Sequence, residues 1–172
     1  STDASIINNK GEISSIHLAG AGNMVTMLIK SELGLESFNL AEDIKKYPLA
    51  KVESLFHIRH EDGTVEFFKE PLDPSVFSKV VIIKDGMLVP INGQTSIEKI
   101  RAIRRGAKEK VFVTNCLRAL TIVSPTGNIR DIEFVVLVGG SSLDFEVPQL
   151  VTDSLSQYGV VAGRGNIRGT EG

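Results

Sequence analysis

The 172-residue sequence has one cysteine, Cys116, and no tryptophan. A single cysteine cannot form an internal disulfide, so a reducing compartment such as the cytoplasm is expected. No apolar run approaches the roughly 20 residues that a membrane-spanning helix needs, and the polar start STDASIINNKGE lacks the features of a signal peptide. The chain also lacks an initiator methionine, which indicates a cut or processed chain.

A large excess of charge of either sign is absent too. Nineteen basic and 21 acidic residues leave a net charge of −2, which argues against a general nucleic-acid binder. Apolar residues make up 42% of the sequence and charged residues 23%, which is typical of a globular protein. The length suits one domain with a core or two small lobes, and we expect neither a nucleic-acid nor a membrane partner.

Strand and helix patterns are mixed along the chain. An early hairpin (4–7 and 13–18) and a second one (52–68) flank two helices (23–33 and 40–46). Later, a helix (97–120), a buried strand (133–138), a second helix (146–157) and a short strand (160–161) follow one another. The order predicts an α/β fold with a mixed sheet and flanking helices. Residues 69–96 are expected to form a small β-rich insert or an irregular connection.

The helix predicted over 97–120 has an apolar and a basic side, and Ser96 can cap its start. The residues expected to be buried are Ile100, Ile103, Ala107 and Val111. The residues expected to be exposed are Arg101, Arg104, Arg105 and Lys108.

Two strand-to-helix junctions are candidate ligand sites. In FVVLVGGSS, Gly139 and Gly140 would let a flat ligand approach the backbone, and the N–H groups and hydroxyls that follow, beginning with Ser141, would bind it. The alternative is a tight turn. In HLAGAGNM, Gly20 precedes a helix start that favours anions, although small residues there can also serve close packing alone.

Other polar residues have simpler interpretations. Glu42, Lys45 and Lys46 are expected on the solvated side of a short helix, where they form surface ion pairs unless a ligand lies nearby. His57 and His60 in HIRH point to opposite faces of a strand and cannot share a metal ion. Cys116 is interpreted as a small core residue. We predict no catalytic residue and no metal site.

Taken together, these motifs resemble the second half of an actin-like (ribonuclease H-like) ATPase domain. STDASII resembles the continuation of a phosphate loop, HLAGAGNMVTMLI a phosphate-side stretch with its helix, AEDIKK the adenine-side helix, and FVVLVGGSS the adenosine motif. The nucleotide-binding residues that the resemblance implies are Ser1, Asp3, Gly20, Glu42, Lys45, Lys46, Gly139, Gly140 and Ser141. Two departures are Ala19 in place of a glycine and Leu143 in place of an arginine that stacks on adenine.

A closer resemblance covers nearly all of residues 1–172. KKYPLAKVESLFHIRHEDG, RAIRRGAKEKVFVTNCLRAL and SPTGNIRDIEFVVLVGGSSLDFEVPQLV are similar to the large subunits of diol and glycerol dehydratase-reactivating factors. The family implies an ATP-dependent, chaperone-like reactivase that releases damaged cobalamin from a coenzyme B12-dependent dehydratase. It works with a small subunit in the cytoplasm or in a bacterial microcompartment.

The resemblance implies that ATP or ADP with Mg²⁺ binds to the complete protein, which would be a slow ATPase. The chain alone is expected to be inactive, since the first phosphate motif and the metal-holding aspartates are absent from it. Two alternatives stay open: a metabolite kinase of the actin-like superfamily, and a non-catalytic interaction domain of the same fold.

Overall fold

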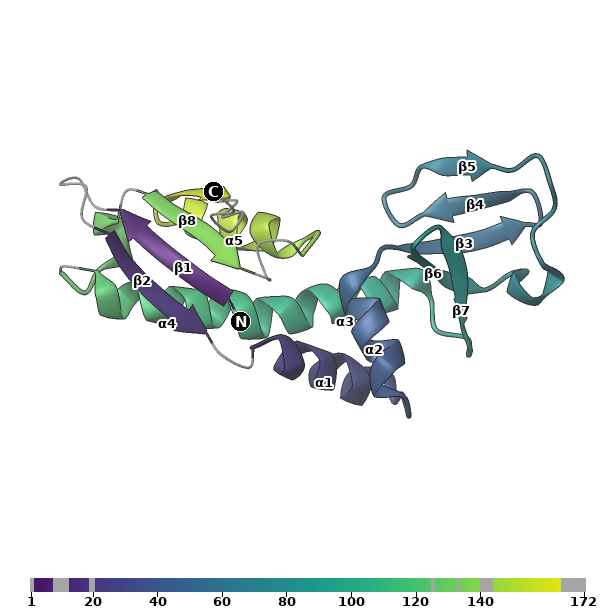
Figure 1. The fold of residues 1–172 in the computed structure, drawn as a ribbon, viewed down its shortest axis with the longest axis horizontal. Helices are drawn as coiled ribbons and strands as arrows, with labels where there is room; N and C mark the ends of the chain where they lie inside the picture. Colours follow the sequence, from purple (N-terminus) through teal and green to yellow (C-terminus); the bar gives the residue numbers. More distant parts are fainter. Residues whose placement is uncertain are drawn as a thin grey trace, which may run out of the picture. The chain divides into compact units, whose positions relative to one another are not determined.

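The computed structural model describes residues 2–7, 13–18, 21–124, 126–132, 134–139 and 144–164. The chain divides into two compact units, Ser1–Val25 with Gly106–Gly172, and Thr26–Arg105. Two helices, α1 (Ala21–Leu33) and α3 (Ile97–Lys108), each begin in one unit and end in the other. Each unit has its own β-sheet (Figure 1).

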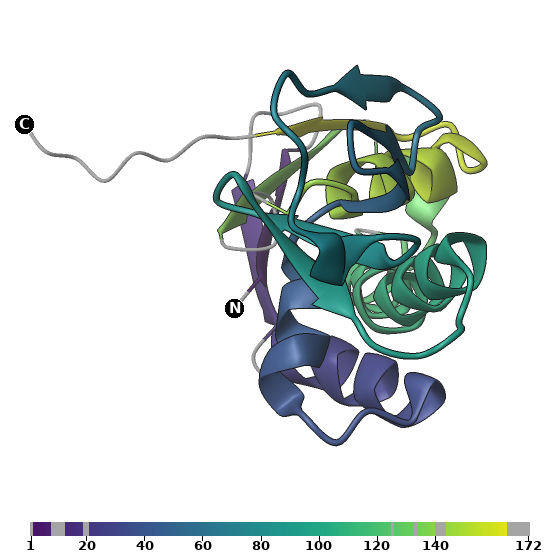
Figure 2. The same ribbon diagram turned by 90° about the vertical axis from the view of Figure 1, so that its right-hand side faces the viewer.

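The sheet of the first unit has four strands in the order β2-β1-β8-β9. The strands are β1 (Thr2–Ile7), β2 (Ile13–Leu18), β8 (Phe134–Gly139) and β9 (Val161–Arg164). β1 is antiparallel to both β2 and β8, as the arrows in Figure 1 show, whereas β9 runs parallel to β8. Figure 2 shows β1 and β2, in purple, from a second direction. The predicted early hairpin and the predicted mixed sheet are therefore confirmed.

The helical part of the first unit covers this sheet. A π-helical segment, η2 (Glu109–Val113), continues α3 and leads into α4 (Thr114–Val123), which contacts β2 (Figure 1). After the short helix η3 (Ile129–Asp131) and β8, α5 (Val147–Ser156) packs against η2 and β9. The buried apolar side chains of this unit include Val111, Phe112, Cys116, Leu120, Val135, Leu150, Val151 and Leu155.

The sheet of the second unit has five antiparallel strands in the order β5-β4-β3-β6-β7. Its strands are β3 (Leu49–Ser54), β4 (His57–His60), β5 (Val65–Phe67), β6 (Val80–Lys84) and β7 (Met87–Ile91). The segment predicted as one hairpin forms three strands, because the chain already turns once between β3 and β4. The expected turn at Glu61-Asp62-Gly63 joins β4 to β5.

Residues 69–96 contain a short helix, η1 (Pro74–Val76), and strands β6 and β7. Val76 packs in one buried cluster with Val52, Ile58 and Val81, so the segment shares the core of the five-stranded sheet. Its identity as an insert in a larger domain stays a prediction.

Helix α2 (Phe38–Lys46) packs against β6. It begins where the Ser37 hydroxyl accepts a hydrogen bond from the Leu40 N–H at 3.2 Å, and it ends before Pro48. Helix α3 begins after Ser96, whose hydroxyl accepts from the Lys99 N–H at 3.2 Å as predicted. None of the helices in the described part of the chain is long and apolar enough to span a membrane.

The two sides of the long helix are partly as predicted. Ile100, Ala107 and Val111 are buried, whereas Ile103 is only half-buried. Arg101 is exposed and Arg105 is half-buried.

The prediction that Arg104 and Lys108 are exposed is wrong, since neither has any exposed surface. Their charges are buried because carboxylates from distant parts of the chain, described below, meet them there. Helical periodicity identifies the polar side of a helix but not the elements that cover it.

Candidate functional site

A polar cluster in the second unit is built around Glu42 on α2. The Thr26 hydroxyl on α1, which is fully buried, donates a hydrogen bond of 2.5 Å to Glu42 Oε2. The two residues are 16 positions apart, so packing of the two helices brings them together. No sequence motif pairs this threonine with the α2 helix.

The lysines of α2 complete the cluster. Lys45 Nζ lies 2.9 Å from Glu42 Oε2, and Lys46 Nζ lies 3.0 Å from Glu42 Oε1. These are the i,i+3 and i,i+4 spacings at which helical side chains meet. Lys46 is exposed as predicted, but Lys45 is 8% exposed and does not lie on a solvated side. Because Lys45 is buried, its ion pair with Glu42 is not an ordinary exposed surface pair.

The electrostatics of the cluster keep Glu42 ionised. Partial burial raises the pKa of the carboxyl group, but hydrogen bonds from Thr26, Lys45 and Lys46 outweigh it and lower the pKa from 4.5 to about 2. The hydrogen bond to Glu42 raises the pKa of Lys46. The arrangement offers carboxylate acceptors beside ammonium donors, which suits hydroxyl groups and ring nitrogens of a polar ligand.

The first unit brings two other predicted residues to one end of its sheet. In the pairing of β1 with β8, Asp3 lies opposite Val138 and Thr2 lies opposite Gly139. Asp3 and Gly139 are far apart in sequence but close in this register. Ser1, Gly20, Gly140 and Ser141 lie outside the described residues, so their place in a nucleotide site stays a prediction.

The junction between β8 and α5 contains residues that the sequence did not single out. Asp144 Oδ1 accepts hydrogen bonds from the N–H groups of Glu146 at 2.9 Å and Val147 at 3.0 Å, and thus caps α5. It also accepts one from Lys108 Nζ at 3.0 Å. Asp144, four residues before Pro148, is a recognisable sign of a helix start in the sequence. No local pattern marked Lys108 as the partner of this aspartate.

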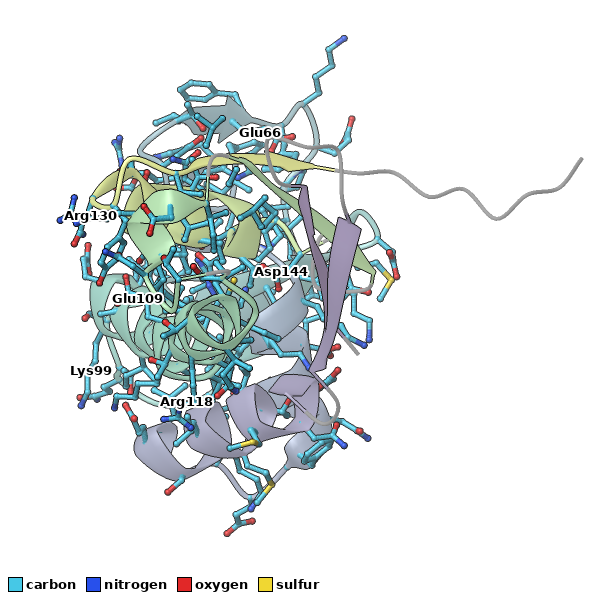
Figure 3. The ribbon with its side chains drawn as sticks, turned by 90° about the vertical axis from the view of Figure 1, so that its left-hand side faces the viewer. Glu66, Lys99, Glu109, Arg118, Arg130 and Asp144 are labelled. Atoms are coloured by element: carbon cyan, nitrogen blue, oxygen red, sulfur yellow. The ribbon has the colours of Figure 1, made fainter. Side chains whose placement is uncertain are left out.

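The remaining candidates have structural partners. His57 Nδ1 lies 2.6 Å from the Ser54 hydroxyl, and His60 Nε2 lies 2.8 Å from Glu66 Oε2 (Glu66 is labelled in Figure 3). Within the described ranges, no group of three or more His, Cys, Asp or Glu side chains could hold a metal ion. Cys116 is buried, and burial raises the pKa of its thiol to about 11, so it is a core residue.

The chain is 74% identical over its full 172 residues to the propanediol dehydratase-reactivating factor large subunit of Citrobacter freundii. The chain spans 28% of that relative's length.

Two solved structures are similar to this one. The chain aligns with a glycerol dehydratase reactivase at a TM-score of 0.88 and 73% identity, covering 99% of this chain and 28% of that one. It aligns with a diol dehydratase-reactivating factor in nucleotide-free form at a TM-score of 0.86 and 72% identity, with the same coverage. The α/β fold with a mixed sheet is therefore shared with the matched 28% of each reactivase chain.

A family model described as the diol dehydratase reactivase ATPase-like domain matches residues 1–172, from end to end. Fold, sequence identity and family match agree, and the chain belongs to the diol dehydratase reactivase ATPase-like domain family.

Proposed function

We propose that this chain forms the adenosine side of the nucleotide site in an ATP-dependent reactivase of coenzyme B12-dependent diol or glycerol dehydratase. The ATPase-like family and the names of the relatives support this proposal. Because the chain spans 28% of those relatives, the activity is proposed for the complete large subunit. In that subunit, ATP would drive the release of damaged cobalamin from the inactivated dehydratase.

The cluster of Thr26, Glu42, Lys45 and Lys46 carries the proposal. Adenosine presents two ribose hydroxyls, which donate and accept hydrogen bonds, and ring nitrogens, which accept them. The Glu42 carboxylate accepts and the two ammonium groups donate, so the set fits the polar edge of a nucleoside. Thr26 and Lys45 are buried and hold Glu42 in one orientation, which lowers the entropy lost on binding.

The sheet end of the first unit is the second proposed contribution. A glycine at the end of β8 permits a flat ring to approach the backbone, since no side chain intervenes. Asp3 on the neighbouring strand lies near that end. We assign the remaining contacts to Ser1, Gly20, Gly140 and Ser141, as the resemblance implies.

The described residues fit the nucleoside better than they fit Mg²⁺, because they include no cluster of three acidic or histidine ligands. We therefore assign the metal to other parts of the complete protein. When bound, Mg²⁺ would neutralise phosphate charge. The term "large subunit" in the relatives' names supports a small subunit as a partner of the complete protein. The dehydratase is the proposed target. The cytoplasmic location stays a prediction.

Titration calorimetry of the full-length large subunit with ADP tests the proposal. Glu42→Gln should weaken ADP binding about tenfold, because a charged acceptor for hydrogen bonds is lost. Glu53→Gln is the matched control: Glu53 also forms an ion pair, at 2.7 Å with Arg59, but lies on the five-stranded sheet. The control should bind ADP like the wild type.

Three results would contradict the proposal. Wild-type affinity in Glu42→Gln would remove the cluster from the nucleotide site. Failure of the wild-type protein to bind ADP or ATP would favour the non-catalytic interaction domain. ADP formation that requires an added hydroxyl substrate, with the phosphoryl group transferred to that hydroxyl, would favour the metabolite kinase.

A further inference from the structure

The first unit contains a buried ammonium group on α3. Lys108 has no exposed surface, and its Nζ lies 3.0 Å from both carboxylate oxygens of Asp144 and 2.8 Å from Glu146 Oε1. It also lies 4.5 Å from the centre of the Phe145 ring. Three consecutive residues of the junction between β8 and α5 are thus held by one side chain.

Asp144 has a double role at this point. The oxygen that accepts from Lys108 also accepts from the backbone N–H groups of Glu146 and Val147 at the start of α5. The side chains of Asp144 and Glu146 are only 11% and 5% exposed, so solvent screens these contacts little. Asp144 is labelled in Figure 3. The ion cluster therefore ties the beginning of α5 to the long helix.

The same junction follows the proposed adenosine motif. β8 ends at Gly139, where the strand pairs with Thr2 of β1. Only four residues separate Gly139 from Asp144, and they include Gly140 and Ser141. The sheet holds the chain before this stretch, and Lys108 holds it immediately after.

We infer that Lys108 is a positioning residue for nucleotide binding: by anchoring Asp144, Phe145 and Glu146, it fixes the chain that follows the Gly-Gly-Ser motif. This inference rests on the proposed function. Lys108 itself is buried among protein groups and does not touch the nucleotide. Its effect reaches the ligand through the position of the backbone at the end of β8.

The competing explanation is that the cluster serves stability alone. Removing one partner of a buried ion cluster leaves an uncompensated charge and destabilises the fold, whatever its role. Replacing every member by neutral groups of similar shape is often tolerated. The two explanations therefore predict different ADP affinities for a variant that is as stable as the wild type but lacks the ion pairs of Lys108.

The experiment uses the full-length large subunit, with ADP and magnesium as the probe in calorimetry and thermal unfolding as the measure of stability. The anchor variant is Lys108→Met. The control is Arg104→Met, which removes the other fully buried cation of α3, paired with Glu61 in the second unit. The third variant combines Lys108→Met with Asp144→Asn and Glu146→Gln, so that no buried charge of the cluster remains.

Both single variants should unfold at a lower temperature than the wild type. Of the two, only Lys108→Met should lose ADP affinity, by about tenfold or more, because the backbone that binds the nucleotide would be displaced. The triple variant should recover stability and still bind ADP weakly. If Lys108→Met does not fold, the triple variant and Lys108→Arg decide the question, with Lys108→Arg keeping more affinity than the triple variant.

Wild-type ADP affinity in the triple variant would overturn the inference and leave a structural ion cluster. An equal loss of affinity in Arg104→Met would overturn it as well, because the effect would then follow stability. Absence of ADP binding by the wild-type protein would overturn both this inference and the proposed function.

Discussion

Arg104 binds both carboxylate oxygens of Glu61, with Nη1 2.8 Å from Oε2 and Nη2 2.7 Å from Oε1. Glu61 Oε2 also accepts a hydrogen bond from the Leu49 N–H at 3.0 Å. The guanidinium fork has no exposed surface, and the planar geometry of both groups suits this paired contact. The pair joins α3 to the turn after β4 within the second unit.

Arg104→Met should lower the free energy of unfolding by about 3 kcal/mol, because the largely buried Glu61 carboxylate would lose both hydrogen bonds from the buried guanidinium group. Urea denaturation followed by circular dichroism measures this change. Arg101→Met is the control: Arg101 is exposed and lies 4.0 Å from Glu61, so its loss should cost less than about 1 kcal/mol. Equal effects of the two substitutions would contradict the distinction between them.

The lowered pKa of Glu42 predicts that the folded protein loses stability in acid. Its pKa in the folded protein, about 2, lies below the ordinary value of 4.5. The contribution of the carboxylate to stability is therefore fully present above pH 4.5 and is lost as the pH falls towards 2. Because the cluster is partly solvated, we expect a contribution on the order of 1 kcal/mol.

The measurement is unfolding by urea at several pH values for the wild type and Glu42→Gln. The difference in stability between them should shrink between pH 4.5 and 2. A difference that stays constant over this range would show that Glu42 does not titrate as described.

Two glycines offer a matched test of backbone conformation. Gly106 lies inside α3 with an ordinary helical φ, whereas Gly34 has a φ of +64° at the end of α1. Neither position has an atom near the place where a Cβ would stand. Gly106→Ala should stabilise the protein by about 0.5–1 kcal/mol, and Gly34→Ala should destabilise it by about 1 kcal/mol. Thermal unfolding of both variants checks the opposite signs.

The 172-residue chain by itself should not hydrolyse ATP at a useful rate. Phosphoryl transfer to water needs a metal on the phosphates and a group that positions the attacking water, and the resemblance assigns these to the other side of a cleft. The chain alone should bind nucleotide weakly, at about millimolar affinity or about −4 kcal/mol. A phosphate-release assay beside the full-length large subunit with magnesium is the test. Equal turnover would show that the catalytic groups lie within residues 1–172.

Most of the element order could be read from local patterns. The early hairpin, the helix capped by Ser96 and the strand that ends at Gly139 were predicted because alternation, helical spacing and turn residues act over a few positions. Residues 52–68, predicted as one hairpin, belong to the three strands β3, β4 and β5. The first turn was not predicted because Leu55-Phe56 is apolar and contains none of the usual turn residues.

The candidate site was less predictable than the fold. The sequence identified Glu42, Lys45 and Lys46 through a resemblance, and helical spacing explains why they meet. Thr26 was missed, because its contact with Glu42 depends on the packing of α1 against α2. The burial of Lys45 was missed for the same reason.

The sequence by itself determined the class of fold, the family and the residues of α3 that carry positive charge. Only the tertiary structure decided that Arg104 and Lys108 are buried. Their carboxylate partners, Glu61 and Asp144, lie 43 and 36 residues away in the chain. A charged side chain leaves water only where an opposite charge and hydrogen-bond partners replace its hydration, and such partners are brought together by folding and not by spacing along a helix.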